Sequence, residues 1–213
     1  VWNLVFMQYE MGLDQSLKAL PAPCVDTGMG LERLACVVNN YASNYDSDLL
    51  RPLIDCAAAL SKKSYLASSG ADDMAMRVIA DHLRAVAFTI ADGQLPSNTG
   101  AGYVIRRILR RAVRYGFTFL QFNEPFVYKL LPVLSRQMAA NFPEIETQQQ
   151  LVSKVIHEEE ASFLRTLAHG IRRFEQYVSQ KTDNSPIDGP FAFELFDTYG
   201  FPVDIVRDIA IER

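Results

Sequence analysis

Asp26-Thr27-Gly28-Met29-Gly30-Leu31-Glu32-Arg33 joins an apolar extended run to a helix and decides how the N-terminal part of the chain folds. Glycine has no Cβ, so the backbone at Gly28 and Gly30 can approach a ligand closely. The helix that begins near Gly30 presents unpaired N–H groups, which favour an anion. Arg33 lies about one turn into that helix and adds a planar guanidinium group suited to phosphate. The pattern predicts a nucleotide site.

The same eight residues also fit a tight strand–helix turn whose Glu32 and Arg33 side chains lie in solvent. Short glycine patterns recur by chance, so these residues alone leave both interpretations open. The stretch has neither the Gly-Lys-Ser/Thr ending of a P-loop nor the third glycine of a dinucleotide-binding turn. Two common phosphate motifs are therefore excluded.

Composition indicates a globular protein of one or two domains. Of 213 residues, 49% are hydrophobic and 22% charged, and no stretch approaches the roughly 20 apolar residues of a membrane span. We therefore expect no membrane partner. Cys24, Cys36 and Cys56 have an odd count and no CxxC spacing, which favours free thiols in the reducing cytoplasm over a redox or metal role.

The first residues, Val1-Trp2-Asn3-Leu4-Val5-Phe6, contain neither an initiator Met nor a basic leader. They do not resemble a secretion signal. The chain starts within an apolar run, and we expect it to be a piece of a longer protein.

The N-terminal forty residues predict two strands and a helix, too few to close a sheet. Residues 1–8 are nearly all apolar and predict a strand buried on both faces. Pro21 and Pro23 break the chain before a short second run through Cys24 and Val25. Without sheet neighbours, we expect residues 1–25 to be displaced, disordered or paired with another chain.

Helical patterns fill the rest of the chain and predict a mainly α fold. Apolar residues recur every three or four positions from Gln148 to Lys181, which predicts a helix of about 50 Å. A helix is expected over about 49–57, after the capping residues Asp46 to Asp48. Other helices are expected over about 74–91, after Gly102, over 125–140, over 191–199 and after Pro202. We expect two domains, residues 1–42 and 43–213.

Five arginines form the second informative group: Arg106, Arg107, Arg110, Arg111 and Arg114. On a helix, four of them share one face and the other lies beside it. Like charges at this spacing repel, so an anion or acidic side chains must compensate. Intramolecular pairing with Asp81, Asp92 or the Glu158–Glu160 run is favoured for any single arginine. For the whole cluster, RNA or DNA phosphates are favoured.

Two polar residues could read a base edge. Asn98 precedes the arginine helix on an exposed loop, and its amide carries both donors and an acceptor. An N-terminal cap or an Asx turn would explain Asn98 equally well. The carboxylate of Asp197 can accept from a base amino group, although a structural hydrogen bond to a loop is the more frequent role.

The remaining polar groups do not suggest catalysis or metal binding. His157 and His169 lie twelve positions apart on one predicted helix, too far to share a metal, and His82 lies on another. We expect surface or hydrogen-bonded histidines and no metal site. The Glu158–Glu160 run is expected to be a solvated face.

Several segments, taken in order, resemble the alanyl-tRNA synthetase family of class II aminoacyl-tRNA synthetases. They are Trp2–Gln8, Val25–Leu34, Ser43–Asp48, Arg77–Arg84, Ala91–Arg114 and Phe196–Asp204. The family's active site lies on an antiparallel sheet built from three motifs, and Gly28 to Arg33 is similar to the third. The resemblance implies a helical tRNA-recognition domain, residues 43–213. A remnant of the catalytic sheet, two strands and the motif 3 helix, would precede it.

The resemblance implies an enzyme that activates alanine with ATP and Mg²⁺ and transfers it to tRNA(Ala). Arg33 would be the catalytic residue that contacts the ATP phosphates, and Asp26 would pair with the alanine ammonium group. Asn3, Val5 and Gly28 would line the amino-acid pocket. The implied alanine and ATP site comprises Asn3, Val5, Asp26, Gly28, Gly30 and Arg33.

The helical part is similar to the region that reads a G·U wobble pair in the acceptor stem. Asn98 and Asp197 match the two residues that approach this pair from opposite grooves. The arginine helix would hold the stem phosphates and so position the RNA. The implied nucleic-acid partner is tRNA, not DNA.

One departure and several missing segments qualify the resemblance. The family usually has arginine where Ala101 precedes Gly102-Tyr103-Val104. Its first two motifs lie upstream of Val1, and its zinc-bearing editing domain lies downstream, so we expect no zinc here and no aminoacylation by this piece alone. The alternatives are a non-catalytic RNA-binding helical module and a purely structural helical domain.

Overall fold

The computed structural model describes residues 2–181, 186–201 and 203–211. Val1 and Pro202, which belong to the predicted first strand and the predicted start of the last helix, lie outside the described residues. The chain forms two compact units, residues 1–51 and 52–213, which we describe separately. The domain boundary between residues 42 and 43 stays a prediction from the sequence.

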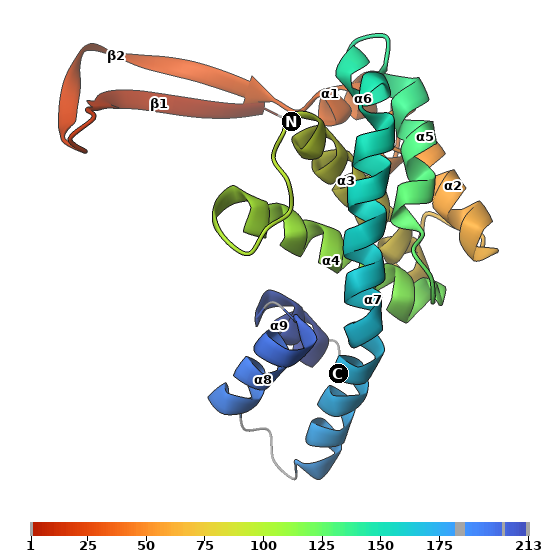
Figure 1. Cartoon of the computed structure of the whole chain (residues 1–213). Helices are drawn as coiled ribbons and strands as arrows, with labels where there is room; N and C mark the ends of the chain where they lie inside the picture. The colour runs from red at the N-terminus through yellow and green to blue at the C-terminus, as the bar shows by residue number, and fades with distance from the viewer. Residues whose placement is uncertain (1, 182–185, 202, 212–213) are drawn as a thin grey trace. The chain divides into compact units, whose positions relative to one another are not determined.

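The first unit is a long β-hairpin followed by short helices (Figure 1). Strand β1 (Trp2–Met11) pairs antiparallel with β2 (Leu17–Met29). Helix α1 (Leu31–Val38) follows the second strand, and a 3₁₀ turn, η1 (Asn44–Asp46), follows α1. Ser43 caps this turn and forms a capping box with Asp46.

The first predicted strand forms, but the burial that we expected for it is wrong. The side chains of Trp2 and Phe6 are 62% and 71% exposed. An apolar run predicts that a strand will be covered, whereas actual burial depends on what packs against it. Two strands alone cover neither face of the hairpin.

The second strand is much longer than the predicted run through Cys24 and Val25, and it includes Pro21 and Pro23. Proline cannot donate a ladder hydrogen bond, but a two-stranded sheet has only edge strands, where proline is tolerated. The pairing also shifts register between Met7 and Tyr9, opposite these prolines. Residues 2–25 pair within the chain, in contrast to the displacement, disorder or pairing with another chain that we expected.

The second unit is built from helices, as the periodicity predicted, and the mainly α fold is confirmed. Its helices are α2 (Arg51–Ser61), α3 (Ala71–Ala91), α4 (Gly100–Leu120), α5 (Val127–Met138), α6 (Pro143–Thr147), α7 (Gln149–Gln180), α8 (Gly189–Tyr199) and α9 (Val203–Ile211). Only α6 was not predicted, because five residues are too few to show a helical period.

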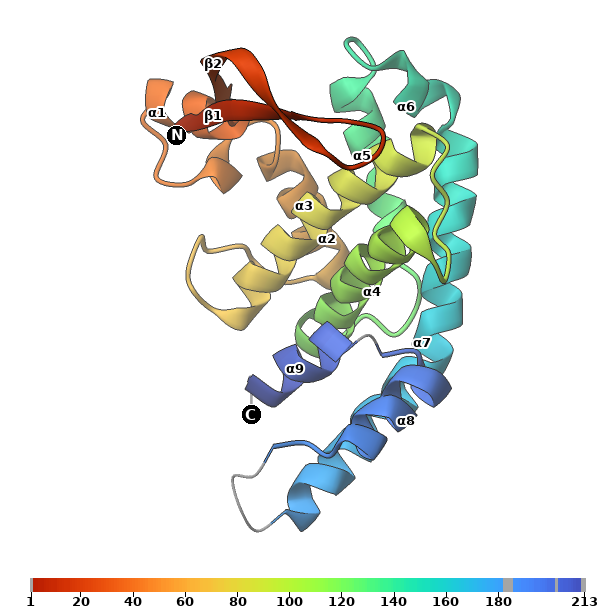
Figure 2. The same ribbon diagram turned by 90° about the vertical axis from the view of Figure 1, so that its left-hand side faces the viewer.

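Helices α3, α4, α5 and α7 enclose the core of the second unit. Figures 1 and 2 show α4 beside α3 and α5 beside α7, and α4 also contacts α7. Leu83, Leu109 and Phe163 are almost completely buried there. Each such side chain stabilises the fold by roughly 1.5–3 kcal/mol. At Gly116 of α4 a Cβ would collide with the Phe126 ring, so glycine allows this close approach.

Helix α8 packs against the C-terminal half of α7, and α9 packs against α8. Between them, Phe201 is fully buried, and a Cβ at Gly170 of α7 would collide with its ring. The Thr166 hydroxyl donates a 2.9 Å hydrogen bond to the carbonyl oxygen of Tyr199. These contacts fix the turn that follows α8.

Glu160 of α7 is fully buried and caps α5 from another helix. Its carboxylate accepts hydrogen bonds from the backbone N–H groups of Phe126, Val127 and Tyr128, at 3.0, 2.9 and 3.2 Å. Three donors that α5 cannot satisfy itself are thereby paired. Burial nevertheless raises the pKa of Glu160 to about 7, although these three hydrogen bonds favour the charged form.

Candidate functional site

The hairpin register brings together four residues that the resemblance assigned to an amino-acid pocket. Asn3 lies opposite Gly28, and Val5 lies opposite Asp26. Opposed residues share a face and side chains alternate along a strand, so all four lie on one face. A Cβ at Gly28 would have no atom within 4 Å, so the space at this position is open. This face presents an amide and a carboxylate beside a small apolar side chain.

Gly30 and Arg33 lie at the start of α1. The Arg33 side chain carbons lie 3.5–3.7 Å from where a Cβ of Gly30 would be, which is ordinary van der Waals contact. Gly30 has φ −72° and ψ 123°, a conformation open to any residue. What glycine contributes here is the absence of a side chain. No side chain among the described residues caps the first turn of α1.

In the second unit, α4 and the end of α8 enclose a pocket of about 420 Å³, which we call the α4 pocket. It is lined by Asn98, Tyr103, Arg106, Arg107, Arg110, Phe196, Asp197 and Gly200. Two residues far apart in sequence, Asn98 and Asp197, therefore share one pocket with three of the five arginines. Three guanidinium groups and a single carboxylate give its lining an excess of positive charge.

The loop that carries Asn98 folds back on the first turn of α4. The Ser97 N–H donates to the Gly102 carbonyl oxygen at 3.0 Å. A Cβ at Gly102 would collide with Ser97 and with the Leu95 carbonyl oxygen, so this loop conformation requires glycine. The N-cap residue of α4 is Thr99, so Asn98 is not the helix cap that we considered as an alternative.

Arg106 connects α4 to α7. Its Nε and Nη2 atoms donate to the two carboxylate oxygens of Glu159, at 3.0 and 2.7 Å. Its Nη1 atom donates to Oδ1 of Asn98. Both side chains of the ion pair are less than one-fifth exposed. The alternative of intramolecular pairing thus holds for Arg106, with a partner in the predicted acidic run.

Arg110 connects α4 to the turn after α8. Its Nη1 atom donates a 2.6 Å hydrogen bond to the Gly200 carbonyl oxygen, and the guanidinium carbon lies 5.1 Å from the centre of the Phe163 ring. Burial, followed by the positive charge of Arg106, lowers the pKa of Arg110. Arg110 lines the α4 pocket, and an anion bound there would stabilise its partly desolvated positive charge.

Arg107 and Arg111 lie differently with respect to the pocket. Arg107 lines the pocket, and its guanidinium carbon lies 5.7 Å from the centre of the Tyr103 ring. Arg111 is outside the lining and lies 3.3 Å from a carboxylate oxygen of Asp208 on α9. Asp208, which was not among the predicted partners, thus balances the charge of Arg111.

Arg114 lies in the interior, only 1% exposed, with its guanidinium carbon 4.5 Å from the Tyr115 ring centre. Position 114 shares the helical face of positions 107, 110 and 111, and this phase suggested a common surface. Helix α4 is packed on several sides, so the phase alone does not determine exposure. Arg114 is therefore buried in the folded chain and does not lie on the exposed surface that its helical phase suggested.

Asp197 is exposed in the last turn of α8. Among the described residues its carboxylate has no hydrogen bond or ion pair, so the alternative of a structural hydrogen bond to a loop is not seen. Gly200 ends α8 with φ +69°, a left-handed conformation that favours glycine. This turn places Asp197 and Gly200 on the same pocket as the arginines.

Sequence reasoning missed three residues that line the pocket, Tyr103, Phe196 and Gly200, and it named Glu159 only as one member of an acidic run that could pair with the arginines. Glu159 belonged to a run that we expected to be a solvated face, and this expectation holds only for Glu158. Successive helical residues point about 100° apart, so three adjacent acids face three different environments. The glycine after α8 and the aromatic residues near Asn98 and Asp197 were visible in the sequence, but they carried no signal of a shared pocket.

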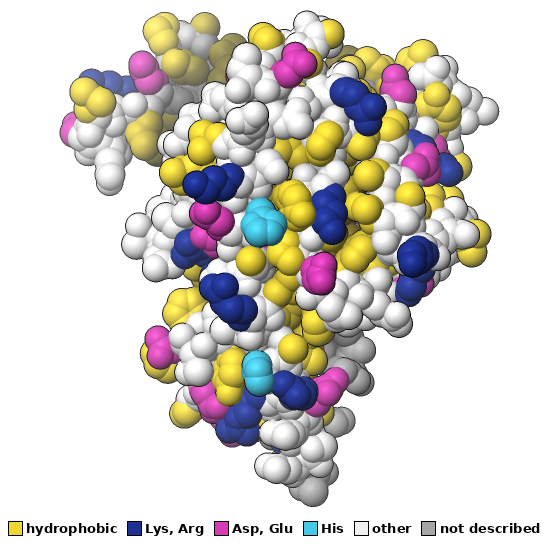
Figure 3. Space-filling view, turned by 45° about the vertical axis from the view of Figure 1, so that its right-hand side comes forward, with side chains coloured by type: hydrophobic (Ala, Val, Ile, Leu, Met, Phe, Trp, Pro, Cys, Tyr) yellow, Lys and Arg dark blue, Asp and Glu magenta, His cyan; other side chains and the backbone are white. Residues whose placement is uncertain are grey.

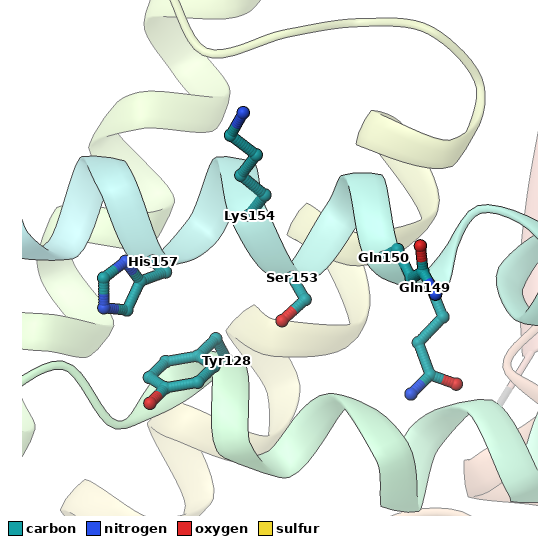
Figure 4. A pocket seen from close by; sticks show the side chains of 6 residues that line it. All are labelled: Tyr128, Gln149, Gln150, Ser153, Lys154 and His157. Carbon is teal, nitrogen blue, oxygen red and sulfur yellow. The ribbon is translucent and has the colours of Figure 1, made fainter.

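A second pocket, of about 480 Å³, is lined by Tyr128, Gln149, Gln150, Ser153, Lys154 and His157. Figure 4 shows Tyr128 beside His157, with ring centres 4.9 Å apart, while Lys154 points away from them. On the face shown in Figure 3, lysines and arginines are scattered among acidic and apolar side chains. The clustered guanidinium groups of the α4 pocket make it the stronger candidate for an anionic ligand.

Cys24, Cys36 and Cys56 are free thiols, as the sequence predicted, and burial raises the pKa of Cys56. His82 lies 2.9 Å from the carboxylate of its neighbour Asp81. In residues 2–181, 186–201 and 203–211, no group of three or more side chains could hold a metal ion. Within the same ranges, no helix is both long enough and apolar enough to cross a membrane.

Comparisons with known proteins agree with this architecture. A family model described as tRNA synthetases class II (A) matches residues 1–213. The chain is 58% identical over 213 residues to an alanine–tRNA ligase of Christiangramia forsetii and 54% over 218 residues to one of Cytophaga hutchinsonii. All of this chain is covered, but it spans only 24% of the length of each of these relatives. The chain therefore belongs to the class II (A) family of tRNA synthetases.

Proposed function

We propose that this chain is part of an alanine–tRNA ligase of the cytoplasm, to which it contributes the third motif and acceptor-stem recognition. In the whole enzyme, the alanine carboxylate attacks the α-phosphate of ATP, and pyrophosphate leaves. A hydroxyl of the terminal tRNA ribose then attacks the carbonyl carbon of the adenylate, and AMP leaves. The names of the relatives and the family match support this assignment.

The hairpin face supplies groups suited to alanine. We assign the ammonium group of the substrate to Asp26, because a carboxylate offers charge-assisted hydrogen bonds. Val5 and Gly28 lie on the same face, where a β-branched side chain limits pocket size and a glycine leaves room. A pocket of this kind discriminates by only about 1–3 kcal/mol per methylene, and it cannot exclude glycine by bulk.

The start of α1 supplies groups suited to ATP. We assign Arg33 to the ATP phosphates, next to the uncapped first turn of α1 and the bare backbone of Gly30. Mg²⁺ would be held largely by the phosphates themselves, since this ion usually takes only one or two protein carboxylates. The contribution of these residues is positioning and electrostatic stabilisation of the transferring phosphate.

Support for the RNA assignment comes mainly from the shared position of Asn98 and Asp197 in the α4 pocket. An amide and a carboxylate on one positively charged pocket offer the hydrogen-bonding groups needed to read base edges. We assign phosphate contacts to Arg107 and Arg110, which line the pocket. Arg111 is outside the pocket lining, but its side chain is 41% exposed, and we assign it a further phosphate contact.

Binding of short RNA duplexes to the 213-residue chain tests this function. An acceptor-stem duplex with the G·U pair should bind more tightly than the same duplex with a G–C pair, and both should weaken as salt rises. Arg110→Ala should weaken both duplexes and flatten the salt dependence, because one phosphate contact is lost. A purely structural helical domain would bind neither duplex.

The alternative, a non-catalytic RNA-binding module, predicts the same RNA binding without a nucleotide site. Photo-crosslinking with an azido analogue of ATP, in a full-length protein that contains this chain, separates the two. Labelling that depends on Arg33 favours the ligase. Absence of labelling, or labelling that Arg33→Ala leaves unchanged, favours the module.

A further inference from the structure

Arg106 makes two kinds of contact at once. Two of its nitrogen atoms bind both carboxylate oxygens of Glu159, and the third binds the side-chain oxygen of Asn98. The paired arrangement with Glu159 fixes the plane of the guanidinium group, because both N–H groups of one edge are engaged. The third nitrogen is therefore held in a defined direction, toward the loop before α4.

This geometry determines which end of the Asn98 amide is available to a ligand. Guanidinium is only a donor, so the amide atom that faces Arg106 must be the carbonyl oxygen. The amide NH₂ group is left to donate elsewhere. An asparagine that could otherwise present either a donor or an acceptor is thereby set as a donor. On the same pocket, Asp197 can act only as an acceptor when it is ionised.

Glu159 is well placed to hold this arrangement. It lies on α7, and its side chain is only 19% exposed, whereas that of its neighbour Glu158 is 65% exposed. Within the part of the chain that the structure describes, the partner of Glu158 is Lys154, at 4.0 Å on the same helix. The two acids carry the same charge on the same helix, but only Glu159 reaches α4.

We propose that Glu159 is a positioning residue for RNA recognition, which acts through Arg106 to orient the amide of Asn98 as a hydrogen-bond donor toward the bound stem. This inference rests on the proposed function. Without the Glu159 carboxylate, Arg106 loses its anchor and becomes free to bind phosphate, while the amide of Asn98 can rotate. The preference for the duplex with the wobble pair should then fall, although affinity for the duplex without it should not.

The test compares the two duplexes, with G·U or G–C at the recognised position, by fluorescence anisotropy with the 213-residue chain. Glu159→Ala should reduce the preference for the wobble pair about two- to tenfold, the range expected for one net hydrogen bond. Affinity for the G–C duplex should stay equal or rise, with a steeper salt dependence, because a cation is released. Glu158→Ala removes the same charge and should leave the preference unchanged.

Two further variants separate positioning from general damage. Arg106→Lys keeps the charge but cannot hold both the carboxylate and the amide in one plane, so it should also lose the preference. In the double variant Asn98→Ala with Glu159→Ala, the loss of preference for the wobble pair should equal the loss in Asn98→Ala alone. Thermal unfolding by circular dichroism checks that each variant is folded.

The outcomes distinguish this inference from the function on which it rests. If the wild-type chain shows no preference for the wobble pair, the proposed function fails. If the wild-type chain shows the preference and Glu159→Ala retains it, the positioning role fails and the proposed function stands. An additive loss in the double variant would also overturn the positioning role.

Discussion

The Nη1 atom of Arg110 donates a 2.6 Å hydrogen bond to the backbone carbonyl oxygen of Gly200, and this contact joins the arginine helix to the turn after α8. Asp197 lies one turn before that glycine. Because Arg110 is partly buried, the bond forms with little competition from water. Arg110 therefore couples the position of α4, which follows the loop of the donor Asn98, to the position of the acceptor Asp197 at the end of α8.

Replacing Gly200 should disturb both stability and recognition. In Gly200→Ala, the Cβ would lie 2.8 Å from Nη1 of Arg110, at a residue with φ +69°. A left-handed alanine costs about 1–2 kcal/mol before any clash. We expect a loss of at least that size in urea unfolding, together with weaker duplex binding. Gly189→Ala, where a Cβ meets no atom within 4 Å, is the control and should change stability little. Equal effects of the two changes would contradict this explanation.

Restoring a cation at position 101 should strengthen RNA binding without altering selectivity. Ala101 is exposed in the first turn of α4, at a position where the resemblance described above implies an arginine. Ala101→Arg should tighten binding of the G·U and G–C duplexes by the same factor and steepen the salt slope by up to about one. Ala101→Glu, as the opposite charge, should weaken both. A gain confined to one duplex would indicate a base contact instead.

Stability should depend on the titration of Glu160. Burial raises the pKa of this carboxyl from 4.5 to about 7 in the folded chain. The unfolded chain therefore loses its proton first, so the contribution of Glu160 to stability is fully present below about pH 4.5. It is lost as pH rises toward about 7, by up to about 3 kcal/mol in total. Urea unfolding of wild type and Glu160→Gln between these pH values measures the difference, and parallel curves would contradict the prediction.

The 213-residue chain alone should not catalyse alanine-dependent pyrophosphate exchange. The alanine face is exposed on a two-stranded hairpin, and in the described part only Arg33 is assigned to the phosphates. Such a face neither excludes water nor holds the reactants in line. A full-length relative provides the positive control under identical conditions. Exchange near the rate of that relative would show that the hairpin face is sufficient.

Much of the fold could be predicted because long helices have a clear period and clear ends. Helix α7 was expected from Gln148 to Lys181 and spans Gln149–Gln180. The ends predicted at residues 91 and 199 are confirmed for α3 and α8, and a glycine, Gly93 or Gly200, follows each end closely. The length of β2 was missed because Pro21 and Pro23 normally interrupt a sheet, and only the open edges of a hairpin accommodate them.

The candidate site was less predictable, because its contacts join residues distant in sequence. The family resemblance suggested that Asn98 and Asp197 act together, whereas no spacing in the chain did. Which acid would pair with Arg106 could not be predicted either, since Glu159 is one of three adjacent glutamates. The packing of α7 against both α4 and α5 decides that Glu159 meets an arginine and Glu160 caps a helix.

The most direct test of the central claim is the ratio of dissociation constants for the G–C and G·U duplexes, measured for wild type and Asn98→Ala at one salt concentration. We predict that the wild-type chain prefers the wobble pair by about 1–3 kcal/mol, a typical cost of one wrong base pair. In Asn98→Ala the ratio should approach one. A variant that retains the full wild-type preference would contradict the assignment of base reading to Asn98.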